Sequence, residues 1–598
     1  MRPATRALIA VFLVATLIHA AIASPAQDQS SQAVSQSPAA GPLVTLQGVV
    51  LNTNTGQPLP RALVRIEGDA NTGALTDSAG RFQIPGLPAG PQTIRIHKPG
   101  FRDRSYATED VGYQSDGPAH NVLVAAGMPD LVFTLTPTSA IYGHVDLSTG
   151  DPAQGISLTL LKQVVSNGRA VWVQNSTTKT NGFGAYRFAG LPAGVYALFS
   201  QPALESEPAT TALADRVSVT RSGYPGVFYP QAQEFSGATR IWLAAGDQAE
   251  ANMHLTLEPF YAVTATAILP NGKPYSDDGL VENSSPGPGP ATVLDSAGHL
   301  MPYTVQFDPR NHVFQANLPD GSYTLFVGVA FEETNTNPPV EMVGRNRKRV
   351  MLLSGFAEVS IEGHSVSNLR IPLSPLSNWP IHLRAVRTSV HPVQSSTSPN
   401  QGLQATVVVE AIHAGEAPVD GSAGDGPAES MGSDLLELSA FALGPHWIST
   451  QLNDRSLCVD SFTAGGSNLA REPLNVPLGA SAPRMELTLR DDCAKLALTL
   501  PPALAEFLPG DEPFYTVYVV PDFDTTTDIP PMNMHPSSGA SLNVDGLTPG
   551  SYHVYVFDHP VRLEYRNPAA LAALPTPGQP VTLSAGATSS LLLEVLAQ

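Results

Sequence analysis

The stretch "TDSAGRFQIPGLPAGPQTIRI" (residues 76–96) decides the fold, because its pentapeptide "GLPAG" returns 104 residues later within "TNGFGAYRFAGLPAGVYAL" (residues 180–198). Related versions are "LPDGSYTL" (318–325) and "LTPGSYHV" (547–554), and "LGPHWI" (443–448) is a more divergent copy. Five copies at spacings of about a hundred residues indicate a repeated structural unit, not a coincidence of composition.

The repeated stretch consists of turn chemistry. Thr-Asp-x-x-Gly (76–80) is typical of a hairpin turn, where the Asp side chain accepts from its own backbone and the Gly supplies a positive φ. In Leu-Pro-x-Gly the Pro fixes φ and ends strand pairing, and the Gly tolerates a tight conformation before the next strand. We interpret six residues as structural turn positions: Gly86, Pro88, Gly90, Gly190, Pro192 and Gly194. None of them offers a nucleophile, a base or a metal ligand.

A second pattern alternates with the first along the chain. "DLVFTLTP" (130–137), "NMHLTLEP" (252–259), "NLRIPLSP" (368–375) and "MELTLRDD" (485–492) alternate apolar and polar residues, as half-buried strands do. About seven short strands in 100 to 120 residues is the scale of a β-sandwich. The sequence therefore predicts an all-β protein, a tandem array of about five Ig-like or transthyretin-like β-sandwich domains. The expected domains are residues 43–137, 138–258, 259–375, 376–490 and 491–598.

The first residues and a few other segments are expected to lie outside the sandwiches. Residues 1–23 carry two basic residues, an apolar run and a small-x-small motif, which is typical of a secretory signal peptide. Residues 24–42 have the composition of a polar linker. Residues 415–434 are predicted to form a long acidic loop, and residues 503–507 and 568–573 short helical turns. No later run reaches the ~20 apolar residues of a spanning helix, so we expect an exported protein of the periplasm, cell surface or medium.

The first unit resembles a known family. "GVVLNTNTGQPLPRALVRIEG" (48–68), "TDSAGRF" (76–82), "LPAG" (87–90) and "GF" (100–101) are similar to the carboxypeptidase regulatory-like domain. This resemblance implies a transthyretin-like β-sandwich, grouped with carbohydrate-binding-like folds. The second unit lacks the G-x-P-L-P segment, and units three to five keep mainly the late turn and its strand.

The charge of the chain excludes some classes of binding partner. The chain has 52 acidic and 32 basic residues and lacks a stripe of Lys and Arg, apart from a short basic run at 345–349. A net charge of −20 argues against nucleic acid and against an anionic bilayer as the partner.

Cys458 and Cys493 are the only cysteines. In an oxidising compartment they are expected to form a disulfide worth about 3 kcal/mol, the alternative being two buried thiols.

Catalytic motifs are weak in this sequence. Ser176 and Lys179 match S-x-x-K without its partner motifs, and His413 and Glu416 match the H-x-x-E metal pair at the edge of the acidic loop. Four Gly-rich-loop aspartates lack the spacing of a calcium loop and are interpreted as solvated turn residues: Asp69, Asp77, Asp420 and Asp425. We expect no enzyme activity, no metal and no cofactor.

Aromatic residues are the candidates for ligand contact, because flat rings stack on the apolar faces of sugars. The proposed contacts lie in the second unit: Trp172, Tyr224, Phe228 and Tyr229. The alternative is that the segment 224–230 packs on its own domain. Trp242 and Trp447 lie on alternating strands and are expected to fill cores.

The sequence thus predicts a non-enzymatic, exported binding or spacer protein, with polysaccharide as the first ligand class to test. The alternative is a structural or protein-docking module, or an accessory subunit of a cell-envelope peptidase or transporter. Sheet edges would then provide the contacts in place of aromatic rings.

Overall fold

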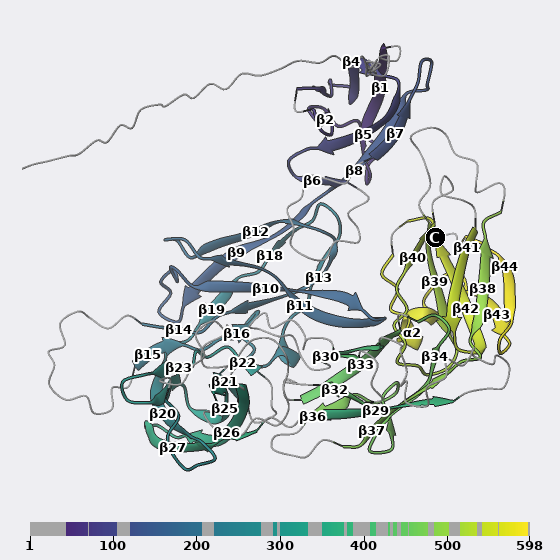
Figure 1. Ribbon diagram of the computed structural model, residues 1–598. Helices are drawn as coiled ribbons and strands as arrows, with labels where there is room; N and C mark the ends of the chain where they lie inside the picture. The colour runs from purple at the N-terminus through teal and green to yellow at the C-terminus, as the bar shows by residue number, and fades with distance from the viewer. Residues whose placement is uncertain are drawn as a thin grey trace, which may run out of the picture.

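The computed structural model describes most of the chain as strands and turns (Figure 1). The described residues are 43–69, 71–103, 120–205, 221–276, 291–295, 300–332, 350–375, 379–386, 407–413, 428–430, 435–438, 444–452, 454–476, 483–501, 515–534, 541–559 and 561–595. The predicted signal peptide, the polar linker, the helical turn at 503–507, Glu416, Asp420 and Asp425 lie outside the described residues.

The all-β prediction is confirmed: the chain forms five β-sandwich units in tandem. The first unit pairs one sheet of order β4-β1-β8-β6 with another of order β3-β2-β5-β7. Its strands are β1 (Leu43–Asn52), β2 (Leu63–Ile66), β3 (Gly73–Leu75), β4 (Arg81–Pro88), β5 (Gly90–His97), β6 (Phe101–Asp103), β7 (His120–Val124) and β8 (Leu131–Pro137). Alternate residues of both sheets fill the space between them, as period-two patterning requires.

The second unit has two sheets. One has the order β12-β9-β18, and β19 also pairs with β9. The other has the order β11-β10-β13-β16, and β17 also pairs with β13. Its elements are β9 (Ser139–Leu147), β10 (Ser157–Ser166), β11 (Arg169–Lys179), β12 (Ala185–Leu191), β13 (Gly194–Ser200), β16 (Val227–Phe228), the 3₁₀ helix η2 (Phe235–Gly237), β17 (Ile241–Leu243), β18 (Gln248–Glu250) and β19 (Met253–Leu255). The strands β14 (Ala203–Leu204) and β15 (Arg221–Tyr224) pair with each other, and β15 also pairs with β20 of the third unit.

The third unit also has two sheets. One has the order β14-β15-β20-β24-β23, and β27 also pairs with β20. The other has the order β22-β21-β25-β26-β28. Its own strands are β20 (Glu258–Ile268), β21 (Ala291–Asp295), β22 (Leu300–Met301), β23 (Gln306–Asp308), β24 (Val313–Leu318), β25 (Gly321–Glu332), β26 (Val350–Ile361), β27 (Val366–Pro372) and β28 (Ser374–Pro375). β14 and β15 come from the chain segment of the second unit, but they complete a sheet of the third unit.

The fourth and fifth units complete the array. The fourth has β29 (Trp379–Val386), β30 (Val407–His413), β31 (Ala428–Ser430), β32 (Leu435–Leu438), β33 (Gly444–Leu452), β34 (Cys458–Ala464), β35 (Ser467–Asn468), β36 (Leu474–Val476) and β37 (Met485–Arg490). The fifth has β38 (Ala494–Thr499), β39 (Tyr515–Pro521), β40 (Met532–Met534), β41 (Ser541–Leu547), β42 (Gly550–Phe557), α2 (Pro568–Ala572), β43 (Gln579–Leu583) and β44 (Thr588–Leu592). The helical turn expected at 568–573 is present as α2. Part of the long loop predicted at 415–434 is wrong, because residues 428–430 form β31, which pairs with β30; the rest of the predicted loop lies outside the described residues.

One strand topology recurs in all five units. The first strand of each unit pairs antiparallel with the strand before the Leu-Pro-x-Gly turn and parallel with the closing strand. In chain order, these pairings are β1 with β4 and β8, β9 with β12 and β19, β20 with β24 and β27, β29 with β32 and β37, and β38 with β41 and β44. The strand after the turn pairs with the second strand, as β5 does with β2 and β13 with β10. The sequence repeat is therefore a repeat of one supersecondary unit.

The repeated turn requires glycine at two points. Gly86 and Gly190 have φ of 76° and 73°, and each lies where the strand register shifts, which is a β-bulge. Gly90 and Gly194, which start the next strand, have φ of 134° and 154°. Residues with a Cβ rarely adopt these values, and the second glycine recurs in the third and fifth units as Gly321 and Gly550, with φ of 153° and 156°.

Candidate functional site

The aromatic residues expected to form an exposed patch are packed instead. Tyr224 and Phe228 are only 9% and 5% exposed, and Tyr229 is half-buried against the main core of the second unit. Phe228 lies between Phe199 and Phe235, with ring centroids 4.6 and 5.3 Å away. Of the two alternatives for 224–230, packing on its own unit is therefore the observed one: Tyr224 and Tyr229 contact the main core, and Phe228 lies in a second, smaller apolar cluster on the outer face of a sheet.

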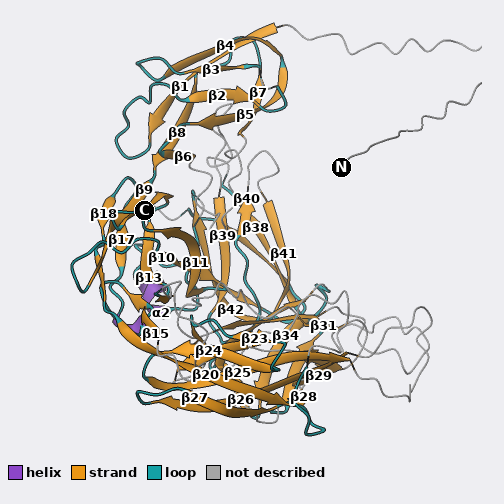
Figure 2. Ribbon diagram, turned by 90° about the vertical axis from the view of Figure 1, so that its left-hand side faces the viewer, coloured by secondary structure: helices purple, strands orange, loops and turns teal. Residues whose placement is uncertain are grey.

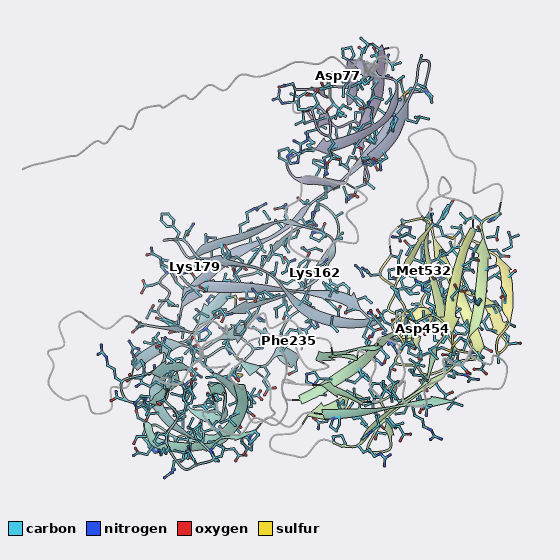
Figure 3. All side chains as sticks on the ribbon, viewed as in Figure 1. Asp77, Lys162, Lys179, Phe235, Asp454 and Met532 are labelled. Carbon is cyan, nitrogen blue, oxygen red and sulfur yellow. A yellow bond between two sulfur atoms is a disulfide. The ribbon has the colours of Figure 1, made fainter. Side chains whose placement is uncertain are left out.

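Trp172 lies at the border of that smaller cluster and is half-buried. Its ring meets Phe235 edge to face, with centroids 5.2 Å apart, and the Arg240 guanidinium lies 4.7 Å from the ring centroid. Phe235, labelled in Figure 3, is contributed by η2, which covers this face of the sheet. Trp172 is thus held in one orientation by an aromatic edge and by a cation.

Trp242 is 74% exposed, so the prediction that it fills a core is wrong. It is the middle residue of β17, and its neighbours Ile241 and Leu243 point into the core of the second unit. In a strand, successive side chains point to opposite faces, so Trp242 must point outward. The alternation Ile-Trp-Leu in the sequence is the signal that would have shown this.

Strand register places the two tryptophans on one line across the outer face of the sheet. Trp172 is opposite Gln163, and Trp242 is opposite Val195. Lys162 is opposite Tyr196, so Gln163 and Val195 are the next pair along the same two strands. We call Trp172, Gln163, Val195 and Trp242 the aromatic row. With neighbouring strands about 4.8 Å apart, its two ends are separated by about 14 Å.

A second site lies where the second, fourth and fifth units meet, and we call it the three-unit junction. Figure 1 shows the β10–β11 hairpin of the second unit extending toward β33 of the fourth unit and α2 of the fifth. The tip of the hairpin is Asn167-Gly168, with φ of 46° and 71°, as in a two-residue hairpin turn. Asn-Gly is a strong signal for a two-residue hairpin turn, so the sequence alone could have placed a turn at 167–168.

The fifth unit holds this tip with backbone and side-chain hydrogen bonds. The Tyr565 hydroxyl donates to Asn167 Oδ1 at 2.7 Å, and Arg566 donates from its amide to Gly168 O at 2.9 Å and from Nε to Asn167 O at 3.0 Å. The Ala170 amide donates to Glu564 Oε1 at 3.3 Å. The Tyr565 ring covers Gly168 so closely that a Cβ there would lie 2.6 Å from it.

The fourth unit meets the same hairpin through Trp447. The Arg169 guanidinium lies 3.4 Å from the Trp447 ring centroid. Trp447 is half-buried and outside the core cluster of its unit, so the prediction that it fills a core is also wrong. Burial and the nearby positive charge of Arg566 lower the pKa of Arg169 to about 10, so the guanidinium remains charged at neutral pH.

Two of the weaker candidates, Asp69 and Asp77, are ordinary turn residues. The Asp69 and Asp77 carboxylates accept hydrogen bonds from backbone amides of their own turns, as turn aspartates do. Within the described residues, no group of three or more His, Cys, Asp and Glu could hold a metal ion. In that part of the chain, no helix is both long enough and apolar enough to cross a membrane.

Comparison with known families supports the resemblance that the sequence of the first unit shows. Residues 45–127 match the family model of the carboxypeptidase regulatory-like domain. The match confirms the resemblance seen in the sequence, and it covers the first unit only. A search of curated proteins found no match.

Solved structures similar to the chain include the Bacillus anthracis TIE protein, at 12% identity over 56% of this chain and 51% of that one, with a TM-score of 0.15. A streptococcal ancillary pilin is similar at 12% identity over 56% of this chain and 100% of that one, with a TM-score of 0.18. Two B repeat units of the Staphylococcus aureus collagen binding protein are similar at 10% identity over 72% and 94%, with a TM-score of 0.14. The chain spans about half the length of the Bacillus anthracis protein.

Proposed function

We propose that this is an exported, non-enzymatic binding and spacer protein whose second unit binds a polysaccharide along the aromatic row. The observation that carries the proposal is the outward position of Trp242, 74% exposed on a strand whose other side chains are buried. Tryptophan is enriched at binding interfaces, because its ring offers a large apolar face and its N–H a hydrogen-bond donor. The regulatory-like fold of the first unit adds only an analogy, because fold does not determine function.

The chemistry of the row suits a flat, uncharged ligand. Trp242 offers an exposed ring and Trp172 a half-buried one, and Gln163 between them has an amide that both donates and accepts hydrogen bonds. None of the four side chains of the row can act as a nucleophile or as a general acid or base, which supports binding without catalysis.

The row is also mechanically fixed, which a binding surface requires. Tyr196, Ile241 and Leu243 lie beneath it and are buried in the main core of the second unit. Of the residues that the sequence indicated for sugar contact, Trp172 belongs to the proposed site. Tyr224, Phe228 and Tyr229 support it from below or beside it. Sites built on such strands hold their geometry better than sites on loops.

Retention of the full mature protein on a panel of immobilised polysaccharides tests the proposal. We expect at least one polysaccharide to retain it, and Trp242→Ala to weaken that binding about tenfold, the effect of losing about 1.4 kcal/mol. Phe183→Ala is the matched control, because Phe183 is an equally exposed aromatic (80%) of the same unit that lies outside the row. It should bind like the wild type.

Two results would contradict the sugar proposal: no retention on any polysaccharide, or equal losses for Trp242→Ala and Phe183→Ala. If instead a defined envelope protein bound the chain and Trp242→Ala left that binding unchanged, the protein-docking alternative would replace it.

A further inference from the structure

A short segment of the fifth unit, residues 524–528, lies along an edge of β33 in the fourth unit, and we call it the strap. Thr527 of the strap forms a parallel bridge with Thr450 of β33. The Thr450 amide donates to Thr526 O at 2.8 Å, and the Asp528 amide donates to Thr450 O at 3.0 Å. Because β30 occupies the other edge of β33, and β36 pairs with β33 only at residues 444–446, the strap extends the sheet of the fourth unit beyond the end of β36.

Side chains reinforce this contact between the fourth and fifth units. Thr450 and Thr526 are 0% and 1% exposed, and the Thr450 hydroxyl donates to the Thr526 hydroxyl at 3.0 Å. At one end of the strap, Gln451 Nε2 donates to the Asp528 carboxylate at 3.0 Å. At the other end, the Asp524 carboxylate accepts from a guanidinium of the fourth unit. The strap is therefore bonded to the fourth unit along its whole length.

The opposite side of the strap is held by Arg566. In an extended segment, successive carbonyl groups point to opposite sides. While Thr526 O faces β33, the carbonyl oxygens of Thr525 and Thr527 accept from the Arg566 guanidinium, the latter at 2.9 Å. The remaining nitrogen, Nε, donates to Asn167 O at the tip of the β10–β11 hairpin, at 3.0 Å. One guanidinium thus connects the strap with the second unit.

Tyr565 provides a second connection between the strap and the hairpin tip. The amide of Ile529, which directly follows the strap, donates to the Tyr565 hydroxyl at 3.3 Å, and this hydroxyl donates to Asn167 Oδ1 at 2.7 Å. The five N–H groups of an arginine lie in one rigid plane, so its acceptors must all be in place together. If the hairpin tip leaves, Arg566 and the buried Tyr565 lose acceptors that hold them against the strap.

We propose that Arg566 and Tyr565 form a latch that couples two contacts of the fifth unit, the one with the hairpin tip of the second unit and the one between the strap and the fourth unit. The two contacts open and close together, so the array has a closed and an extended state. Because coupling between two sites is reciprocal, loosening either contact loosens the other. The latch does not depend on the proposed polysaccharide binding.

Hydrogen exchange of the full mature protein, followed by mass spectrometry, tests the latch from the side of the second unit. Gly168→Ala disturbs the hairpin tip, because its Cβ would lie 2.6 Å from the Tyr565 ring. We expect the amides of the strap and of Thr450 to exchange about tenfold faster, a factor within the usual range of coupling between sites. Gly150→Ala is the matched control, since its Cβ meets no atom within 4 Å, and it should leave this exchange unchanged.

The reciprocal measurement starts from the fourth unit. Thr450→Val removes a buried hydroxyl and leaves that of Thr526 without its donor, so the strap is held less tightly. We expect the amides of Gly168 and Ala170, at the hairpin tip, to exchange about tenfold faster, as reciprocity requires. Thr76→Val is the matched control, because Thr76 is a buried threonine (3% exposed) of the first unit, and it should leave the tip protected.

Arg566→Lys assigns the coupling to the guanidinium, because lysine keeps the charge without the planar set of donors. In this background Gly168→Ala should add little to the exchange of the strap, either because the contacts have become independent or because both are already open. The proposal is overturned if Gly168→Ala and Thr450→Val each affect only their own contact, or if the coupling is unchanged in Arg566→Lys. If Gly168→Ala leaves the tip protected, the response of the tip to Thr450→Val decides.

Discussion

Tyr565 covers the tip of the β10–β11 hairpin at the three-unit junction. Its ring covers Gly168, its hydroxyl donates to Asn167 Oδ1 at 2.7 Å, and the Ile529 amide donates to the same hydroxyl at 3.3 Å. Burial is the main reason why the pKa of Tyr565 rises to about 12. A phenol that is harder to ionise in the assembled molecule than in the unfolded chain makes the junction sensitive to alkali.

The sign of this sensitivity follows from the direction of the shift. The folded-state pKa lies above the unfolded value of about 10, so the contribution of Tyr565 to stability is complete below pH 10 and is lost as the pH rises toward 12. We expect Tyr565→Phe to lose less stability than the wild type between pH 10 and 12 in thermal unfolding. Identical pH profiles for the two proteins would show that Tyr565 ionises normally.

At the scale of elements, the connection between the fourth and fifth units is fixed covalently. A disulfide joins Cys458, the first residue of β34, to Cys493, which immediately precedes β38, with Cα atoms 5.9 Å apart. The expected disulfide is therefore present. Beside it, the Arg490 guanidinium binds the Asp492 carboxylate, whose pKa falls because of this hydrogen bond, and also contacts Asp460 at 3.3 Å.

Removal of the disulfide should destabilise the fourth unit. The bridge closes a loop over a separation of 35 residues, and the double variant Cys458→Ser/Cys493→Ser should lose about 3 kcal/mol of unfolding free energy. Denaturant unfolding of the variant, and of the wild type with and without reductant, measures this loss. The variant should no longer respond to reductant, and an unchanged wild-type midpoint in reductant would contradict the prediction.

At the scale of the whole molecule, the array folds back on itself. In Figures 1 and 2 the fifth unit lies beside the second, although two further units separate them in the chain. The contact joins residues 398 positions apart, Asn167 and Tyr565. Between the fourth and fifth units, the Thr450 amide donates to Thr526 O at 2.8 Å, and the Asp528 amide donates to Thr450 O at 3.0 Å. The second, fourth and fifth units therefore meet at one place.

A side chain at the tip of the hairpin should open this arrangement. Gly168→Ala adds a Cβ that would lie 2.6 Å from the Tyr565 ring, at a positive φ that alone costs about 1 kcal/mol or more. The clash is relieved when the second and fifth units separate. We expect a larger radius of gyration in small-angle X-ray scattering, with unchanged β-sheet content by circular dichroism.

The control for this prediction is Gly150→Ala. Gly150 belongs to the same unit and has φ of 86°, but no atom lies within 4 Å of the position that its Cβ would take. Its backbone strain is similar, and it should leave the radius of gyration unchanged. If both variants scatter like the wild type, Gly168 does not hold the array closed.

Local sequence was sufficient to predict the all-β class, the repeated unit and the relation of the first unit to the regulatory-like domains. These features depend on interactions within a few residues: Pro and Gly set the turn at Gly86–Gly90, and period-two alternation sets the strands. The alternation of Ile241, Trp242 and Leu243 likewise indicates that Trp242 points outward.

Which surfaces are covered, and which residues cover them, depends on how the sheets and units pack together. Phe228 is covered because η2 packs on the outer face of its sheet, and Arg169 meets Trp447 because units far apart in sequence come together. Such contacts depend on how whole surfaces fit, through many weak interactions summed over long separations, and no local pattern encodes them. The sequence alone was sufficient to predict the five sandwiches and their turns. The aromatic row and the three-unit junction arise only from how sheets and units pack, because burial is a property of the assembled molecule.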